Sequence, residues 1–423
     1  MKKLFMCLLM PLFLEAESLN ELFTALKTHA TVKSDILSVQ KTALQKEMIQ
    51  SSLYPKVSLF ASYDNYNEAT GLLPVAPNEL LDMVKDQNVA QPFSTNIYRE
   101  GARFSMPIYV KSIYTTGKQA EAMYRSVKMK KYISLLENEA LIVSANANFL
   151  YLESLEKSLK IKEASLLEAK KTVQIKVNNG RSSASSLYKI IDSLNEVSIG
   201  KNNIELEKQR LISSIEGLTG IRITESVKMQ KKEIFQRETI DSLKPLQEKI
   251  KADRFKVRAE KEKLYPTLYA HGSYVLSQAA AYNNDKQVYE KYGNLGITLN
   301  IPLLDMTKYD AVALAEVELQ SSQVALEKLQ DTLGAKAAML KASLDLLHNS
   351  IKLYQESIEN KKQLLTIAKV NYKSGRLSTE EYLRYEDTVV AQESKLYKAE
   401  AMAWQTEMEL AVIYVNNIEE MVE

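Results

Sequence analysis

Few side chains in this sequence have the types and spacing that catalysis or metal binding needs. The three histidines, His29, His271 and His348, lie far apart and have none of the spacings typical of metal ligands. The sequence contains no nucleophile motif and no glycine-rich phosphate loop. The single cysteine, Cys7, lies in an apolar run at the start of the chain. We therefore expect no enzyme, no cofactor and no metal centre.

The side chains of most interest gather instead at two glycine turns. Residues 179–182 read Asn-Gly-Arg-Ser, and residues 374–377 read Ser-Gly-Arg-Leu. Each turn follows a long stretch without proline that is rich in Ala, Leu, Lys and Glu, which predicts a helix. Glycine just past a helix end adopts the left-handed cap conformation at little cost. Each turn therefore predicts a helical hairpin, and the chain contains two of them.

The two turns belong to an internal repeat. Leu-Tyr-Pro at 53–55 recurs at 264–266, and Pro107 recurs as Pro302, 195 residues later, the same offset that separates the two turn glycines. Repetition of this kind defines the folding unit. We predict a signal peptide at 1–16, a first repeat at 17–220, an equatorial segment between the repeats at 221–245, a second repeat at 246–412 and an equatorial tail at 413–423.

The start of the chain has the pattern of a secretory signal peptide. Two lysines precede an apolar run at 4–14, and the small residue Ala16 offers a cleavage point. An ordinary buried first helix is the alternative. The net charge of +2 comes from interspersed charges of both signs, so we expect no nucleic-acid partner. No later run approaches the roughly 18 apolar residues of a membrane-spanning helix, so any crossing must use strands.

Each repeat predicts two strands and one long helix. Alternating residues predict strands near 55–65, 97–107, 266–276 and 288–301, and the long helices cover 112–178 and 306–373. One apolar and one polar face per strand suits a barrel with lipid outside and water inside, with a half-buried soluble sheet as the alternative. A seven-residue apolar repeat in the second long helix indicates coiled-coil packing. Its members are Leu326, Leu333, Leu340, Leu347 and Tyr354, with Ala337, Leu344, Ile351, Ile358 and Leu365 as companions.

Four strands cannot close a barrel, and open strand edges are not tolerated in lipid. Three chains would supply twelve strands and two helical hairpins each, with pseudo-sixfold symmetry from the repeat. The predicted fold is thus mainly helical with a β-barrel part, an α/β tube. This plan resembles the TolC family of outer membrane efflux proteins over essentially the whole mature chain. The resemblance rests on the paired Leu-Tyr-Pro segments, Pro107 and Pro302, and the two turn motifs at 177–187 and 372–383.

The resemblance implies a homotrimer in the outer membrane, in contact with its lipid, with a helical tube that projects into the periplasm. The trimer would be the exit duct of a tripartite efflux or type I secretion system. Its partners would be a periplasmic adaptor protein and an inner-membrane efflux pump or ABC exporter. The cargo stays open between small toxic compounds or metals and proteins or peptides. A coiled-coil structural protein of the cell envelope and a periplasmic adaptor are the rival interpretations.

The resemblance also implies roles for residues of the two turns, where the family contacts its adaptor and closes the tube. Gly180, Arg181, Gly375 and Arg376 would form the adaptor-binding tip.

The gate would comprise Tyr372, Ser186, Glu381, Arg384 and Arg376. Where the family often has an acidic residue in each repeat, this chain has Ser186 and Glu381, and Arg384 replaces a further acidic residue. We therefore expect a Tyr372–Ser186 hydrogen bond of about 1 kcal/mol, supported by Glu381 pairing with Arg376 or Arg384. The alternative is that these residues are solvated charges at helix ends.

Overall fold

A computed structural model of the chain describes residues 18–72, 74, 85–86, 88–232 and 238–422. The predicted signal peptide at 1–16 lies outside the described residues. The helices are α1 (Leu19–Thr28), α2 (Ala30–Ser51), α4 (Lys111–Asn178), α5 (Ala184–Thr219), the 3₁₀ turn η1 (Asp241–Leu243), α6 (Lys244–Glu262), α7 (Met306–Lys373), α8 (Thr379–Tyr414) and α9 (Ile418–Met421). The strands are β1 (Lys56–Gly71), β2 (Phe93–Tyr109), β3 (Thr267–Ala280) and β4 (Gln287–Asn300).

The chain folds into two compact units, each of which takes segments from both halves of the sequence. Unit 1 comprises residues up to 39, 128–245 and 326–423. Unit 2 comprises residues 40–127 and 246–325. The glycine turns belong to unit 1, and all four strands belong to unit 2.

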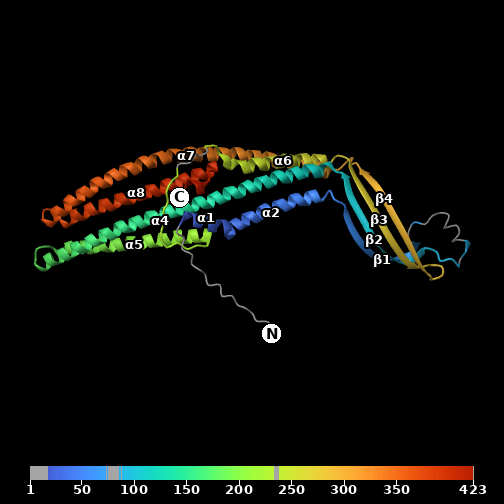
Figure 1. Cartoon of the computed structure of the whole chain (residues 1–423), viewed down its shortest axis with the longest axis horizontal. Coiled ribbons are helices and arrows are strands. Elements are labelled where there is room, and N and C mark those ends of the chain that lie inside the picture. Colours follow the sequence, from blue (N-terminus) through green and yellow to red (C-terminus); the bar gives the residue numbers. More distant parts are fainter. Residues whose placement is uncertain (1–17, 73, 75–84, 87, 233–237, 423) are drawn as a thin grey trace, which may run out of the picture. The chain divides into compact units, whose positions relative to one another are not determined.

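Unit 2 is built on one antiparallel sheet with the strand order β1-β2-β3-β4 (Figure 1). The first two strands are longer than predicted: β1 continues to Gly71 and β2 begins at Phe93, because these two residues still pair with each other beyond a register shift. A second irregularity lies between Pro107 and Tyr109. Proline has no N–H to give to a ladder, so Pro107 suits a position where regular pairing ends.

The pairing register places most apolar residues of the sheet on one face and most polar residues on the other, as the alternation predicts. The apolar face carries Val57, Leu59, Ala102, Phe104, Leu268, Ala270, Leu295, Ile297 and Leu299. The polar face carries Ser58, Ser62, Arg99, Arg103, His271, Ser273, Glu290 and Asn294. On the apolar face Leu59 is 84% exposed and Leu295 is 79% exposed. A single chain therefore leaves this face uncovered.

Unit 1 contains the turn ends of the two predicted helical hairpins, α4–α5 and α7–α8 (Figure 1), whereas the first residues of α4 and α7 belong to unit 2. Its largest core joins α1 to the middle of α4 and to the ends of α5 and α8, with Phe23 and Phe149 fully buried. The segment after α5 packs here because the buried Asn146 side chain exchanges two hydrogen bonds with the backbone of Val227, at 2.7 and 2.8 Å. The segment that connects the two repeats also contacts the C-terminal tail, through an antiparallel β-bridge between Lys231 and Val422.

The side chains of the predicted seven-residue repeat on α7 face the protein interior. All ten of its members are buried or half-buried. A second apolar set on the same helix stays exposed, including Met339, Leu346 and Leu353, again seven residues apart. Among the described helices, none combines the length and apolarity needed to cross a bilayer.

Candidate functional site

The two glycine turns have the same backbone geometry. Gly180 and Gly375 both have positive φ, +69° and +73°. In each turn the glycine N–H donates to the carbonyl three residues back, and the following arginine N–H donates to the carbonyl five residues back. This pair of bonds satisfies carbonyls that the helix end leaves free. The sequence therefore predicts both turns correctly, including their need for glycine.

The four predicted tip residues, Gly180, Arg181, Gly375 and Arg376, are all exposed at these turns. Neither arginine has an ion-pair partner among the described residues. Each turn thus presents one free guanidinium beside a glycine, and guanidinium groups bind carboxylates with paired hydrogen bonds.

The predicted hydrogen bond between Tyr372 and Ser186 is wrong within one chain. Tyr372 is buried, and its ring stacks on Tyr382 with 4.7 Å between ring centroids and 12° between planes. The stacking turns the Tyr372 hydroxyl into the protein, where it has no hydrogen-bond partner among the described groups. Ser186 lies in the first turn of α5, where its N–H donates to the capping Oγ of Ser183 at 3.4 Å.

The predicted ion pairs of Glu381 with Arg376 or Arg384 are also not formed within the chain. Glu381 instead completes a capping box at the start of α8: its Oε2 accepts from the Ser378 N–H at 3.0 Å and the Ser378 hydroxyl at 2.8 Å. These bonds hold the pKa of Glu381 below its usual range, with a smaller contribution from the charge of Arg384. A carboxylate near a helix N-terminus is also favoured by the helix dipole. Glu381 therefore bonds the cap of its own helix instead of pairing with an arginine.

The structure brings together a buried polar cluster that the sequence reasoning missed. Tyr382 Oη donates to Glu386 Oε1 at 2.5 Å, and Ser165 Oγ on α4 donates to the same carboxylate oxygen. Ser165 Oγ and Tyr382 Oη are 2.8 Å apart. The cluster connects the first hairpin, through α4, to the second hairpin, through α8.

The Glu386 carboxylate is under electrostatic strain. It is 6% exposed, and its Oε2 has no hydrogen-bond partner among the described groups. Burial raises the pKa of Glu386, against the lowering effect of the Ser165 and Tyr382 hydroxyls and the Lys162 charge. Burial disfavours a charged carboxylate, and hydrogen bonds offset only part of the cost.

One sequence signal could have revealed this cluster. Glu386 and Glu393 lie seven residues apart on α8 and face Ser165 and Ser158, which lie seven residues apart on α4. Ser158 Oγ donates to Glu393 Oε2 at 2.6 Å. The same spacing on both helices is typical of neighbours in a coiled coil.

A surface ion pair is a further connection between the hairpins near the turns. Lys189 Nζ on α5 lies 2.6 Å from Glu380 Oε2 on α8. The hydrogen bond and charge of Lys189 lower the pKa of Glu380. Both side chains are more than half exposed, so the pair contributes little to stability.

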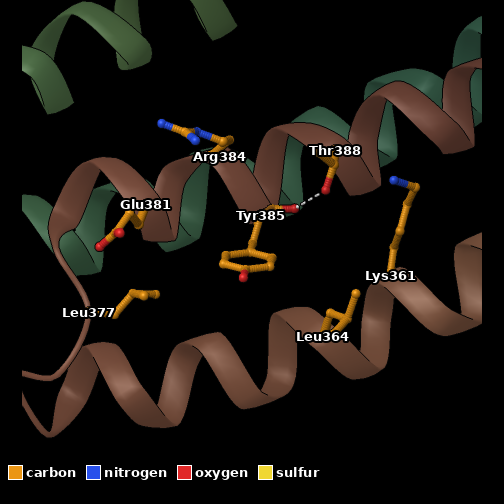
Figure 2. Close-up of a pocket in the computed structure, with 7 residues that line it drawn as sticks. All are labelled: Lys361, Leu364, Leu377, Glu381, Arg384, Tyr385 and Thr388. Carbon is orange, nitrogen blue, oxygen red and sulfur yellow. Dashed lines mark hydrogen bonds between the residues drawn. The ribbon is translucent and has the colours of Figure 1, made fainter.

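A groove runs between α7 and α8 close to the second turn. Figure 2 shows Leu364 on α7 below Tyr385 of α8 and Lys361 extending toward α8 beside Thr388, with Glu381 and Leu377 toward the turn. The groove has a volume of about 340 Å³. Arg384 rises from α8 away from Glu381, and no bond joins the two (Figure 2). The tip therefore combines an apolar floor with separate charges of both signs.

Part of the sequence matches a known protein family. Residues 241–414 match the family described as outer membrane efflux protein. No curated protein matches the chain by sequence.

Crystal structures of three outer membrane proteins show the same fold. The Campylobacter jejuni channel CmeC is 18% identical with a TM-score of 0.79, over 94% of this chain and 85% of CmeC. Vibrio cholerae VceC is 13% identical with a TM-score of 0.78, over 94% of this chain and 95% of VceC. The open state of Neisseria gonorrhoeae MtrE is 14% identical with a TM-score of 0.76, over 96% of this chain and 90% of MtrE.

The fold is that of the TolC-like outer membrane channels, with long helices and four strands per chain. Residues 241–414 thus match the outer membrane efflux protein family in sequence, and the chain as a whole has the fold of these channels. The resemblance drawn from the turns and the repeated prolines is confirmed.

Proposed function

We propose that this chain is an efflux channel of the outer membrane with a large periplasmic portion. Three copies form the exit duct of a tripartite system that is closed at rest near its two glycine turns. The observation that carries the proposal is the buried Ser165–Tyr382–Glu386 cluster, which connects the two hairpins of a chain. A channel that opens at its helical end must separate neighbouring hairpins, and this cluster resists that separation. Opening would then hydrate the strained Glu386 carboxylate.

In this proposal the exposed residues of the turns contact the partners. Arg181 and Arg376, beside Gly180 and Gly375, offer two guanidinium groups per chain to a periplasmic adaptor. The adaptor would connect the channel to an inner-membrane efflux pump or ABC exporter. Tyr372, Ser186, Glu381, Arg384 and Arg376 stay assigned to the constriction. Their contacts there would be made with neighbouring chains, because the expected pairs are absent within one chain.

Single-channel recording of the purified protein in planar bilayers tests the closed state. Tyr382→Phe removes the hydroxyl that bonds Glu386 and Ser165, at a cost of about 1 kcal/mol to the closed form. We expect the ratio of open to closed time to rise about fivefold, the factor that corresponds to this free energy. The matched control is Tyr385→Phe, which alters an exposed tyrosine of the same helix.

Equal open probabilities for Tyr382→Phe, Tyr385→Phe and wild type would contradict closure by the cluster. The same recordings on Glu381→Ala and Arg384→Ala address the exposed charges. An unchanged open conductance in both variants would remove Glu381 and Arg384 from the gate.

A further inference from the structure

The polar face of the sheet carries its charge unevenly along the strands. Three neighbouring rows of paired residues lie on this face at the end where the strands join the helices. From β1 to β4 they are Lys56, Ser105, His271 and Gly296; then Ser58, Arg103, Ser273 and Asn294; then Phe60, Gly101, Val275 and Tyr292. These rows contain Lys56 and Arg103 and no carboxylate.

The acidic residues of the polar face lie in the rows farther from the helices. Asp64 and Glu290 are found there together with Arg99. The Arg99 guanidinium lies 2.8 Å from the Asp64 carboxylate, so this arginine is neutralised. The charges of the polar face are therefore separated, with unbalanced cations toward the helices.

Both cations near the helices are exposed and free of ion pairs with any described residue. The Arg103 guanidinium carbon lies 4.0 Å from the centre of the Phe60 ring. A cation over an aromatic face is attracted by the ring quadrupole, which fixes its position without cancelling its charge. Paired neighbours lie about 5 Å apart and alternate residues about 7 Å apart, so Lys56 and Arg103 act on the same volume of solvent.

We propose that Lys56 and Arg103 form a cationic belt inside the channel that favours the passage of anions over cations. The inference rests on the proposed function, because it needs three sheets closed around a water-filled interior with the apolar face toward lipid. Three chains would contribute six cations to one ring. Water inside a wall of low dielectric focuses the field of such a ring. The selected class is small anions and anionic rather than cationic cargo.

Reversal potentials of single channels in a KCl gradient test the belt. For the double variant Lys56→Gln/Arg103→Gln we expect the chloride-to-potassium permeability ratio to fall about threefold near 0.1 M salt, where the Debye length is about 10 Å. The reduction should shrink near 1 M salt, because screening shortens that length to about 3 Å.

Two controls separate the belt from other effects. The double variant Lys56→Arg/Arg103→Lys keeps both charges and should keep the wild-type ratio. Lys291→Gln removes a cation from the apolar face, opposite Leu276, and should leave the ratio unchanged.

An unchanged ratio in the glutamine double variant, in channels of otherwise normal conductance, would overturn the belt and leave the channel function intact. A wild-type protein that forms no channels would instead overturn the proposed function, and the belt with it.

Discussion

At the scale of single residues, two carboxylates in unit 1 are buried without a full set of partners. Glu386 has hydroxyl donors on one oxygen, whereas Glu139 on α4 is 2% exposed and its Oε2 has no hydrogen-bond partner among the described groups. Burial raises the pKa of Glu139 to about 7, helped by the Glu419 charge and opposed by Lys27. Glu139 is therefore a carboxyl whose proton is part of the folded structure near neutral pH.

This raised pKa makes the stability of unit 1 depend on pH. Glu139 holds its proton in the folded chain up to about pH 7, whereas the unfolded chain loses it near the ordinary value of 4.5. The folded state thus binds more protons at Glu139 between these values, so the contribution of this group to stability is greatest below about pH 4.5 and falls as the pH rises through 7. The loss amounts to about 3 kcal/mol. Glu139→Gln keeps the shape without the charge, and should raise the thermal midpoint at pH 8 but not at pH 4.5.

Circular dichroism melts of the detergent-solubilised protein at the two pH values measure this effect. Glu137→Gln changes an exposed carboxylate on the same helix and is the matched control. A Glu139→Gln variant with the same thermal midpoint as wild type at pH 8 would contradict the raised pKa of the buried Glu139 carboxyl.

The residue scale is also where sequence reasoning was weakest. It selected Tyr372, Glu381 and Arg384 by their distance from the glycines, but not the bonds that these residues make. Glu381 bonds its own helix cap, because Ser378 is three residues away and is always within reach. The Tyr372–Tyr382 stack depends on how α7 and α8 pack, which sequence distance from a turn does not determine.

At the scale of elements, most of the fold could be predicted. The long helices were expected at 112–178 and 306–373 and are found at Lys111–Asn178 and Met306–Lys373. Their ends are sharp in the sequence, because glycine turns end them and prolines precede them. The ends of β1 and β2 beyond residue 65 and before residue 97 were missed. Pairing there resumes after an irregular segment, and such pairing between distant residues leaves no local pattern.

The turn glycines and the helix glycines should respond oppositely to the same substitution. A Cβ at Gly375 or at Gly334 in α7 would meet no atom within 4 Å, so neither alanine clashes. Only Gly375 has positive φ, and alanine there costs about 1–2 kcal/mol. In the interior of α7, Gly334→Ala should instead stabilise by roughly 0.5–1 kcal/mol.

Thermal melts of Gly375→Ala and Gly334→Ala, each compared with wild type, measure the direction of both stability changes. The first midpoint should fall and the second should rise. A rise in both midpoints would show that the turn does not hold its left-handed conformation.

At the scale of the whole molecule, one chain leaves too much apolar surface uncovered to stand alone. The stripe on α7 that includes Leu346 and Leu353 is 67% and 63% exposed at these two residues. Burying a leucine contributes about 1.5–3 kcal/mol, so a second copy of the chain is the natural cover for it. Leu346→Glu/Leu353→Glu would place unpaired carboxylates in that contact, at a larger cost.

Native mass spectrometry of the detergent-solubilised protein should show trimers for wild type and a shift to monomers for Leu346→Glu/Leu353→Glu. Lys352→Glu changes the charge of an exposed neighbour on the same helix and should leave the trimer intact. A glutamate double variant that stays fully trimeric would contradict the assignment of this stripe to the subunit contact.

The sheet order has a consequence for how such an assembly comes into being. β1 and β4 are its two edges, and they differ in sequence and length. Pairing of each edge with the opposite edge of another copy, in a head-to-tail ring, leaves no edge open. Completion of the fold then depends on subunit encounter, so its rate rises with chain concentration. One copy with a defective edge breaks the whole ring, and such a variant would be dominant over the normal protein in a cell that makes both.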